Sequence, residues 1–223
     1  MAAKYFPPAM QASADGLLCV GGNLSAPWLL DAYRYGIFPW PFWENEPMMW
    51  WSPDPRAILP MESLNISRRL SRTVRSNRFQ ATCNTAFKQV LEGCATGPNR
   101  SGGTWLIPEM IEAYVHLHQL GHAHSIEVWR DGQLAGGTYG VAIGGLFAAE
   151  SMFYRIRDAS KVALVYLVAH LRHRGYQLLD IQQWTPHTGR LGAIEISRKE
   201  YLQRLATVVD LPVIMGEQLE GEV

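Results

Sequence analysis

Apolar and polar residues alternate along residues 124–153 in a pattern that predicts three consecutive β-strands. The segments "HSIEVWR", "QLAGGTYGVAI" and "LFAAESMF" are rich in β-branched and aromatic residues. Asp131-Gly132 and Gly144-Gly145 separate these segments, and such dipeptides are typical of tight hairpin turns. We therefore expect an antiparallel meander in the second half of the chain.

A crossover helix and a further strand are predicted after the meander. Residues 161–174 ("KVALVYLVAHLRHR") are apolar over much of a helical surface and end at Gly175. The segment "YQLLDIQQW" (176–184) is then typical of a strand, and a short strand (191–196) and a helix (198–209) follow. This order of elements is that of the acetyltransferase core called the GNAT fold. We expect an α+β chain with a GNAT-like C-terminal domain over residues 61–223, built on a mixed, mostly antiparallel sheet.

Residues 1–60 are rich in Pro, Trp and Gly and predict a small N-terminal α/β domain. One helix is expected at 26–35 ("APWLLDAYRY"), and it ends before Gly36. The prolines that follow predict ordered loops rather than regular β-ladders. Tryptophans in such loops either anchor the loops to the core, which is the commoner role, or stack on a planar ligand. The tryptophans concerned are Trp40, Trp43, Trp50 and Trp51.

The charge balance restricts the partners of the chain. Its 20 basic and 20 acidic residues cancel, so a polyanion would have to bind to a local basic patch. Residues 63–91 contain no acidic residue and predict such a patch on a helix. If this segment is helical, its arginines form one stripe, which is either a polyanion-binding surface or a solvated face. The arginines are Arg68, Arg69, Arg72, Arg75 and Arg78.

Several other classes of protein are disfavoured. The three cysteines form no C-x-x-C pair, which argues against a disulfide framework and a thiolate metal site. His116, His118, His122 and His124 are interrupted by Gly121 and have no carboxylate among them, so we expect no metal. The start of the chain lacks the apolar core of a signal peptide, and no apolar run could span a bilayer. These features predict a cytoplasmic protein.

Asp180 and Gln182 give the segment 176–184 an unusual polar face. Side chains alternate across a strand, so these two residues share one face while Leu179 and Ile181 share the other. The polar face is either a functional site or a structural feature that needs a water-exposed edge or a matching cation. The turn "YRIRDAS" (154–160) contains no glycine, whereas acyl-coenzyme A enzymes of this fold use a glycine-rich turn there to bind pyrophosphate. An acyl group carried on RNA fits both this turn and the arginine stripe.

Several segments together resemble the bacterial leucyl/phenylalanyl-tRNA–protein transferase family, in order from about Gly16 to Leu205. They include "AYRYGIFPW", "WWSPDPRAIL", "LGHAHSIEVW", "GGTYGVAIG", "DASKVAL" and "LGAIEISRKEYL". The resemblance implies an enzyme that moves Leu or Phe, and less readily Met, from tRNA to proteins with N-terminal Arg or Lys. This transfer marks those proteins for degradation and needs no cofactor.

The resemblance also implies roles for individual residues. The family's catalytic pair matches Asp180 and Gln182, and its neighbouring carboxylate matches Glu150. Phe38, Trp40 and Trp105 match the aromatic residues used against the terminal adenosine of the donor. The basic helix that would hold the tRNA acceptor stem matches Arg68 to Arg78. The implied pocket for the amino-acid side chain comprises Phe147, Met152, Leu164, Leu167 and Leu179.

An aminoacyl ester is already activated, so the reaction needs an unprotonated amine at the ester carbonyl and a stabilised oxyanion. We hypothesise that Asp180 orients the acceptor amine and takes up its proton, while Gln182 positions the carbonyl or steadies the oxyanion. An acidic mouth formed by Glu150 and Asp180 would attract the cationic acceptor side chain. No covalent aminoacyl-enzyme is required.

This chain departs from the family pattern at a few positions. Asn23 stands where many relatives have Asp, and Thr185 and Arg190 stand where Asn and Ser are expected. Thr138 occupies a strand position where a larger apolar residue would line the pocket. These differences concern the donor preference and the range of acceptors.

Three alternatives remain at the level of sequence. A coenzyme A-dependent N-acetyltransferase conflicts with the glycine-free turn, and a non-catalytic RNA-binding module leaves Asp180, Gln182 and Glu150 without a role. A cell-wall aminoacyltransferase would carry a coiled-coil arm, and the chain has no such heptad run. We expect a monomer, because no long exposed apolar helix calls for a partner.

Overall fold

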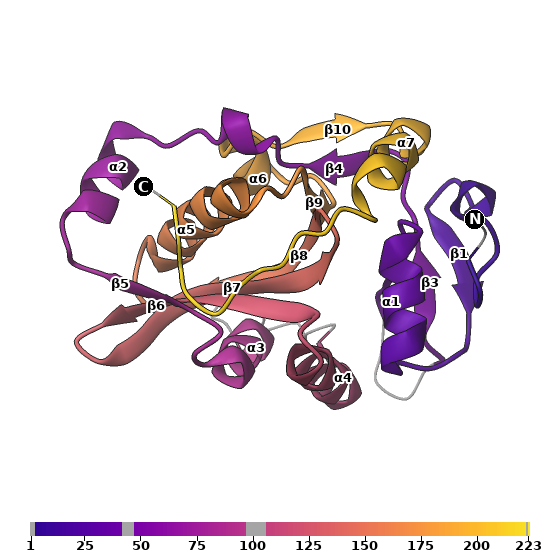
Figure 1. Cartoon of the computed structure of the whole chain (residues 1–223), viewed down its shortest axis with the longest axis horizontal. Helices are drawn as coiled ribbons and strands as arrows, with labels where there is room; N and C mark the ends of the chain where they lie inside the picture. Colours follow the sequence, from indigo (N-terminus) through magenta and orange to yellow (C-terminus); the bar gives the residue numbers. More distant parts are fainter. Residues whose placement is uncertain (1–2, 42–46, 97–105, 222) are drawn as a thin grey trace.

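The computed structural model describes residues 3–41, 47–96, 106–221 and 223 (Figure 1). Two sheets organise these residues. The smaller is antiparallel, has the strand order β1-β3-β2 and belongs to the N-terminal part of the chain. Its elements, with the helices beside it, are η1 (Ala9–Gln11), β1 (Leu17–Val20), α1 (Ala26–Arg34), β2 (Phe38–Pro39) and β3 (Met49–Trp51).

The strands β2 and β3 correct the expectation of loops in the proline-rich segment. Proline cannot donate a hydrogen bond to a β-ladder, but it is tolerated on an edge strand. Pro39 lies on β2, which is an edge of the small sheet, opposite Trp50 of the central strand β3. The backbone N–H of Trp40 then donates to the carbonyl of Met49 at 2.9 Å. The prolines therefore shorten this sheet without preventing it.

The larger sheet has seven strands in the order β10-β4-β9-β8-β7-β6-β5. All neighbours are antiparallel except β8 and β9, which are parallel. The mixed, mostly antiparallel sheet, its meander and its crossover helix are thus confirmed. The strands are β4 (Arg56–Ile58), β5 (Gln80–Cys83), β6 (Ala123–Arg130), β7 (Gln133–Ile143), β8 (Leu146–Tyr154), β9 (Leu178–Gln182) and β10 (Ile194–Ile196).

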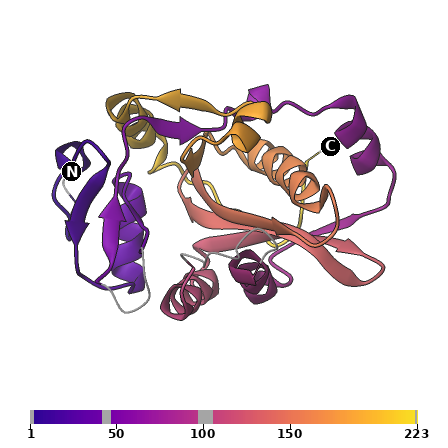
Figure 2. The same cartoon turned by 180° about the vertical axis from the view of Figure 1, so that it is seen from behind.

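Helices cover both faces of the large sheet. The crossover helix α5 (Ala159–Arg174) lies on one face, and α3 (Phe87–Thr96) and α4 (Pro108–Gln119) lie on the other, as both views show (Figures 1 and 2). The helix α2 (Arg68–Arg75) packs against α5. The remaining helical segments are η2 (Met61–Ser63), α6 (Pro186–Arg190) and α7 (Arg198–Val208). Among the described residues, no helix combines the length and apolar character that a membrane span requires.

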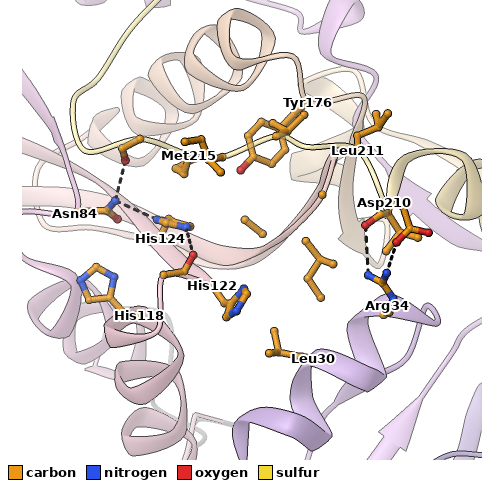
Figure 3. A pocket seen from close by; sticks show the side chains of 18 of the residues that line it. Leu30, Arg34, Asn84, His118, His122, His124, Tyr176, Asp210, Leu211 and Met215 are labelled. Carbon is orange, nitrogen blue, oxygen red and sulfur yellow. Dashed lines mark hydrogen bonds and ion pairs between the residues drawn. The ribbon is translucent and has the colours of Figure 1, made fainter. Parts of the chain in front are cut away.

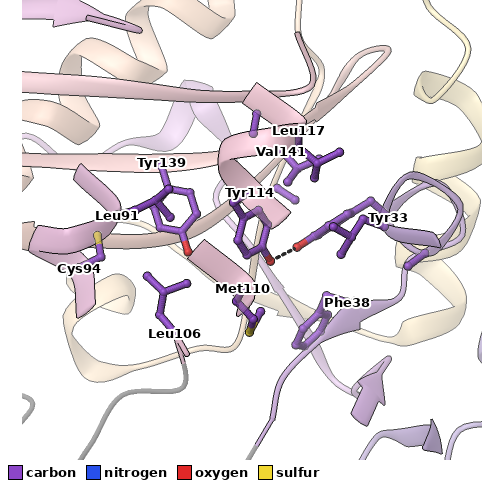
Figure 4. Close-up of a cluster of buried hydrophobic side chains, with 14 of the residues drawn as sticks. Tyr33, Phe38, Leu91, Cys94, Leu106, Met110, Tyr114, Leu117, Tyr139 and Val141 are labelled. Carbon is purple, nitrogen blue, oxygen red and sulfur yellow. Dashed lines mark hydrogen bonds between the residues drawn. The ribbon is translucent and has the colours of Figure 1, made fainter. Parts of the chain in front are cut away.

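Two buried apolar clusters follow this layering. One lies on the α5 face and contains Phe147, Leu167 and Leu179. The other lies on the α3 and α4 face and continues into the N-terminal domain, where Tyr33 and Phe38 belong to the same cluster (Figure 4). The large sheet also takes in β4, which precedes the expected boundary at residue 60. The two parts of the chain therefore share a core.

Candidate active site

A cavity of about 210 Å³ lies where β7, β8 and β9 meet the first half of α5. Its wall is mostly apolar by area, and the Glu150 carboxyl group and the Gln182 side-chain amide are among the polar groups that interrupt it. The apolar part of the wall includes Met152 and Leu164. The other lining residues are Trp40, Leu59, Thr138, Ala149, Ser151, Ile181, Gln183, Thr185, Thr188 and Leu191.

Backbone geometry aims Gln182 into this cavity. Gln182 ends β9 with φ of 58°, which is a left-handed conformation that non-glycine residues seldom adopt. Such conformations cost on the order of 1 kcal/mol and need support from their surroundings. The support comes from Asp180, whose Oδ1 accepts the backbone N–H of Gln182 at 2.9 Å. The chain therefore turns out of the sheet toward α6 at the residue that carries the amide.

Glu150 is the centre of a hydrogen-bond network in the cavity wall. Gln182 Nε2 donates to Glu150 Oε1 at 3.1 Å, and the Tyr114 hydroxyl donates to Oε2 at 3.1 Å. The Tyr33 and Tyr114 hydroxyls lie 2.7 Å apart (Figure 4). Burial raises the pKa of Glu150 to about 8, against the opposing effect of the two tyrosine hydroxyls, and the Asp180 charge raises it further. Glu150 is thus a half-buried carboxyl group that titrates near neutral pH.

Asp180 lies behind the cavity wall and is fully buried, at 0% exposure. Arg56 binds it at two points, with Nε donating to Oδ1 at 2.9 Å and Nη2 donating to Oδ2 at 2.6 Å. The Tyr201 hydroxyl donates to Oδ2 at 2.8 Å. Together with the bond from Gln182, these contacts occupy both carboxylate oxygens. The sequence-based hypothesis of a direct contact between Asp180 and the acceptor amine does not fit this placement.

The Arg56 guanidinium holds Asp180 in place from the neighbouring strand β4. Its carbon lies 4.8 Å from the centre of the Phe38 ring and 4.4 Å from that of the Tyr201 ring. Its Nη1 donates to the carbonyl of Gly36 at 3.1 Å. This pairing satisfies a buried cation and a buried anion at once, which each needs in a medium of low dielectric.

The predicted side-chain pocket is divided by the structure. Met152 and Leu164 line the cavity, whereas Phe147, Leu167 and Leu179 do not. Those three residues are at most 1% exposed and form the core beneath the cavity. Leu59, Ile181 and Leu191 line it instead, although the sequence did not place them in the pocket. Leu59 and Leu191 lie outside regular elements, so no periodic pattern could indicate their role.

Comparison with known proteins assigns the chain to a family. A sequence model described as "Leucyl/phenylalanyl-tRNA protein transferase" matches residues 58–206, and one for the N-terminal domain of the same family matches residues 22–54. The chain belongs to the leucyl/phenylalanyl-tRNA protein transferase family. It is therefore an enzyme that transfers an aminoacyl group from tRNA to protein.

Curated relatives with that name are similar over nearly the whole transferase chain. The protein from Nitratidesulfovibrio vulgaris (strain DP4) is 50% identical, and the alignment covers 96% of this chain and 92% of that protein. The protein from Aromatoleum aromaticum is 52% identical, with 90% and 85% covered. A solved structure titled a ribosomal-protein-alanine N-acetyltransferase, from Brucella melitensis biovar Abortus 2308, is 19% identical. It covers 50% of this chain and 84% of its own, with a TM-score of 0.38, and no conclusion about activity rests on it.

The aromatic residues expected against the donor adenosine have different environments in the transferase. Trp40 is half-buried and lines the cavity. Phe38 is 2% exposed and packs against Arg56, so it supports the site from below. Trp105 lies outside the described residues.

Four arginines of the stripe lie on α2 and Arg78 follows the end of this helix; all five are exposed. The Ser67 hydroxyl caps this helix by accepting the backbone N–H of Leu70 at 3.2 Å. Arg69 is bound at two points by the Asp158 carboxylate, and Arg75 donates to the Ser71 hydroxyl at 2.5 Å. The other three arginines of the stripe form no ion pair within the described ranges of the chain; they are Arg68, Arg72 and Arg78.

A larger cavity, of about 1190 Å³, lies between α1, the end of α4 and the C-terminal segment (Figure 3). His118, His122 and His124 line it, but none of them belongs to a metal-binding group of three within the part of the chain that the structure describes. His118 stacks on the Phe87 ring and bonds to the carbonyl of Ala123. Burial lowers the pKa of His124 to about 4. These contacts give His118 and His124 structural roles in the domain.

Proposed function

We propose that this transferase moves Leu or Phe, and less readily Met, from tRNA to proteins that begin with Arg or Lys. The observation that carries the proposal is the apolar cavity with a carboxyl group and an amide in its wall. The cavity accepts the side chain of the donor, and Glu150 and Gln182 face the ester carbonyl. The transfer marks the acceptor for degradation.

The donor side of the proposal rests on the apolar lining. Met152, Leu164 and Ile181 offer a leucyl or phenylalanyl side chain a surface that excludes water. A charged side chain would lose its hydration there without gaining a partner, so it is excluded. The terminal adenosine lies against Trp40 at the opening.

Glu150 supplies the base in this proposal. Attack by the acceptor amine forms the C–N bond, releases the terminal ribose hydroxyl of the tRNA and frees one proton from the nitrogen. About a tenth to a fifth of an α-amine is already neutral at pH 7. A carboxyl group whose pKa is raised to about 8 is suited to take up the freed proton and pass it to the leaving hydroxyl. In its ionised form this carboxyl group also attracts the cationic side chain of the acceptor.

Gln182 and Asp180 have linked roles in the same account. The Gln182 amide, held by Glu150, donates toward the oxyanion that forms at the ester carbonyl. Asp180 is a positioning residue, because it fixes the backbone of Gln182 and is itself fixed by Arg56. Since Glu150, Gln182 and Asp180 belong to one hydrogen-bonded network, little reorganisation is needed during the reaction.

The exposed arginines of α2 bind the acceptor stem of the tRNA in this proposal. Phosphate contacts by arginine give binding that weakens steeply with salt and carries little sequence information. With tRNA as its donor, the transferase acts in the cytoplasm. In this proposal it acts as a monomer.

Transfer of radiolabelled leucine from leucyl-tRNA to synthetic peptides tests the proposal. Peptides that begin with Arg or Lys should be labelled at least about a hundredfold faster than the same peptide beginning with Ala, because each lost charge-assisted contact in a desolvated site costs on the order of 2–3 kcal/mol. Equal labelling of all three peptides would contradict the proposed specificity for acceptors that begin with Arg or Lys. No labelling of any of them would remove the proposed reaction.

A further inference from the structure

Three cations surround one carboxylate at the start of α5. Asp158 precedes the helix and binds Arg69 through both carboxylate oxygens, at 2.5 and 3.0 Å. Arg157 lies 4.0 Å from the same carboxylate, and Lys161 lies 3.9 Å from it. One carboxylate balances one of these cations. The start of α5 therefore keeps an excess of positive charge.

The helix α6 adds a further cation to this cluster. Arg190 is exposed, donates through Nε to the carbonyl of Pro186 and forms no ion pair among the described residues. The charges of Lys161 and Arg190 both act on His187, which lies on α6. Its pKa is lowered first by burial and then by those two cations. Lys161 and Arg190 thus act on the same point from two different helices.

This basic cluster stands at the edge of the proposed active site. Lys161 is one helical turn before Leu164, which lines the cavity, and residues three apart lie on the same face of a helix. On the other side, Thr185 and Thr188 line the cavity and flank His187 in the chain. The side chain of Lys161 is 32% exposed, so an anion at the cavity opening can reach it.

Like charges this close repel one another, so their arrangement favours an anionic partner. The proposed donor RNA carries an anionic group at a fixed distance from its aminoacyl end. Its aminoacyl group occupies the cavity and its terminal adenosine lies at the opening. The next group along the RNA is the phosphate on the 5′ oxygen of that adenosine.

We propose that Lys161 and Arg190 bind the phosphate that precedes the terminal adenosine of the donor RNA. This inference rests on the proposed function and deepens it, because it names the contact that fixes the RNA end relative to the cavity. The ion pair between Arg69 and Asp158 connects this phosphate-binding site to α2. The phosphates further along the strand then continue onto the arginine stripe.

Two donor analogues that differ only in the phosphate test the proposal. One is adenosine with leucine amide-linked at its 3′ position, and the other is the same compound with a 5′-phosphate. Calorimetry should show that the phosphate tightens binding to the wild-type chain by about tenfold or more, as expected for charge-assisted contacts. Lys161→Gln and Arg190→Gln should each lose most of that gain, while binding of the unphosphorylated analogue changes less than about twofold.

Lys199→Gln is a matched control, because it removes an exposed cation at the start of α7. It should retain the full gain from the phosphate. Equal affinity of the wild-type chain for both analogues would overturn the phosphate-binding site and leave the proposed function intact. The phosphate-binding site would also be overturned, with the proposed function intact, if Lys161→Gln and Arg190→Gln weakened the binding of both analogues equally. Failure of the wild-type chain to bind either analogue would overturn the proposed function and this inference together.

Discussion

Arg56 and Asp180 form a two-point ion pair in which each side chain is 1% exposed. Removal of one partner leaves the other charged and buried, which costs about 3–5 kcal/mol. We therefore expect Asp180→Ala and Arg56→Ala each to lower the free energy of unfolding by that amount. Urea unfolding monitored by tryptophan fluorescence measures the change.

Simultaneous replacement of both partners separates a structural pair from two independent contacts. The double variant Arg56→Met/Asp180→Leu should lose less unfolding free energy than the sum of the losses in the single variants Arg56→Met and Asp180→Leu, because no unpaired charge remains buried. An additive double variant would contradict the coupling. Arg204→Ala is a matched control, since it removes an exposed partner of Glu200 on α7 and should cost less than about 1 kcal/mol.

Glu150→Gln should slow single-turnover transfer by about a hundredfold or more, which is the usual contribution of a general base. The pKa of Glu150 is raised to about 8, so the wild-type rate should rise with pH as this carboxyl group loses its proton. The α-amine of the acceptor titrates in the same range. The variant should therefore keep the amine titration and lose the additional rise.

A rate–pH profile measured from pH 6 to 9 on both proteins checks this expectation. Glu195→Gln, an exposed carboxyl group on β10, is the matched control and should follow the wild-type profile. Superimposable profiles for wild type and Glu150→Gln would show that Glu150 does not act as the base.

The size of the cavity should control the choice of donor. Leu164→Phe places a larger side chain in the wall and should lower kcat/KM for phenylalanyl-tRNA more than for leucyl-tRNA. Differences of one or a few methylene groups in an apolar pocket change such ratios by about 10- to 200-fold. Leu164→Met keeps the volume nearly constant and should leave the ratio within about threefold. An unchanged ratio in Leu164→Phe would place the donor side chain elsewhere.

Acid should destabilise the fold through His124. Its Nδ1 lies 3.0 Å from Asn84 Nδ2 and its Nε2 lies 3.1 Å from the carbonyl of Gly121, so the neutral ring donates from Nε2. Burial lowers its pKa to about 4, whereas the unfolded chain keeps a value near 6.5. Between these values the unfolded chain binds a proton that the folded chain does not. The stabilisation is therefore complete above pH 6.5 and is lost as the pH falls toward 4, by up to about 3 kcal/mol.

Urea unfolding at several pH values between 4.5 and 7.5 tests this effect. His124→Gln should be less stable at pH 7.5 and should show a shallower loss of stability in acid than the wild type. His170, whose pKa is also lowered by burial, accounts for a part of the slope that remains. Equal slopes for the two proteins would contradict the assignment.

Local patterns in the sequence predicted the meander and the crossover helix because their signals are themselves local. Asp131-Gly132 and Gly144-Gly145 fix the two turns between β6, β7 and β8, and Gly175 ends α5 in a left-handed conformation. The positions of the strands in the small N-terminal sheet were not predicted, for the opposite reason. Its strands are two to four residues long, and their pairing depends on segments far apart in the chain.

The site was predicted in part. Glu150 and Gln182 line one cavity, as their resemblance to catalytic residues led us to expect, and Trp40, Met152 and Leu164 join them. The burial of Asp180 could not be predicted, because its partner Arg56 is 124 residues away in the chain. Tyr33 and Tyr114, which are 81 residues apart, likewise gave no signal of their contact near Glu150.

The proposed function requires the donor side chain to occupy the cavity beside Glu150 and Gln182. A crystal structure of the chain with the 5′-phosphorylated, amide-linked leucyl adenosine measures this most directly. We predict that the leucyl group lies between Met152 and Leu164, with its carbonyl oxygen within hydrogen-bond distance of Gln182 Nε2. A leucyl group bound instead in the larger cavity beside His122, with the smaller cavity empty, would contradict the account.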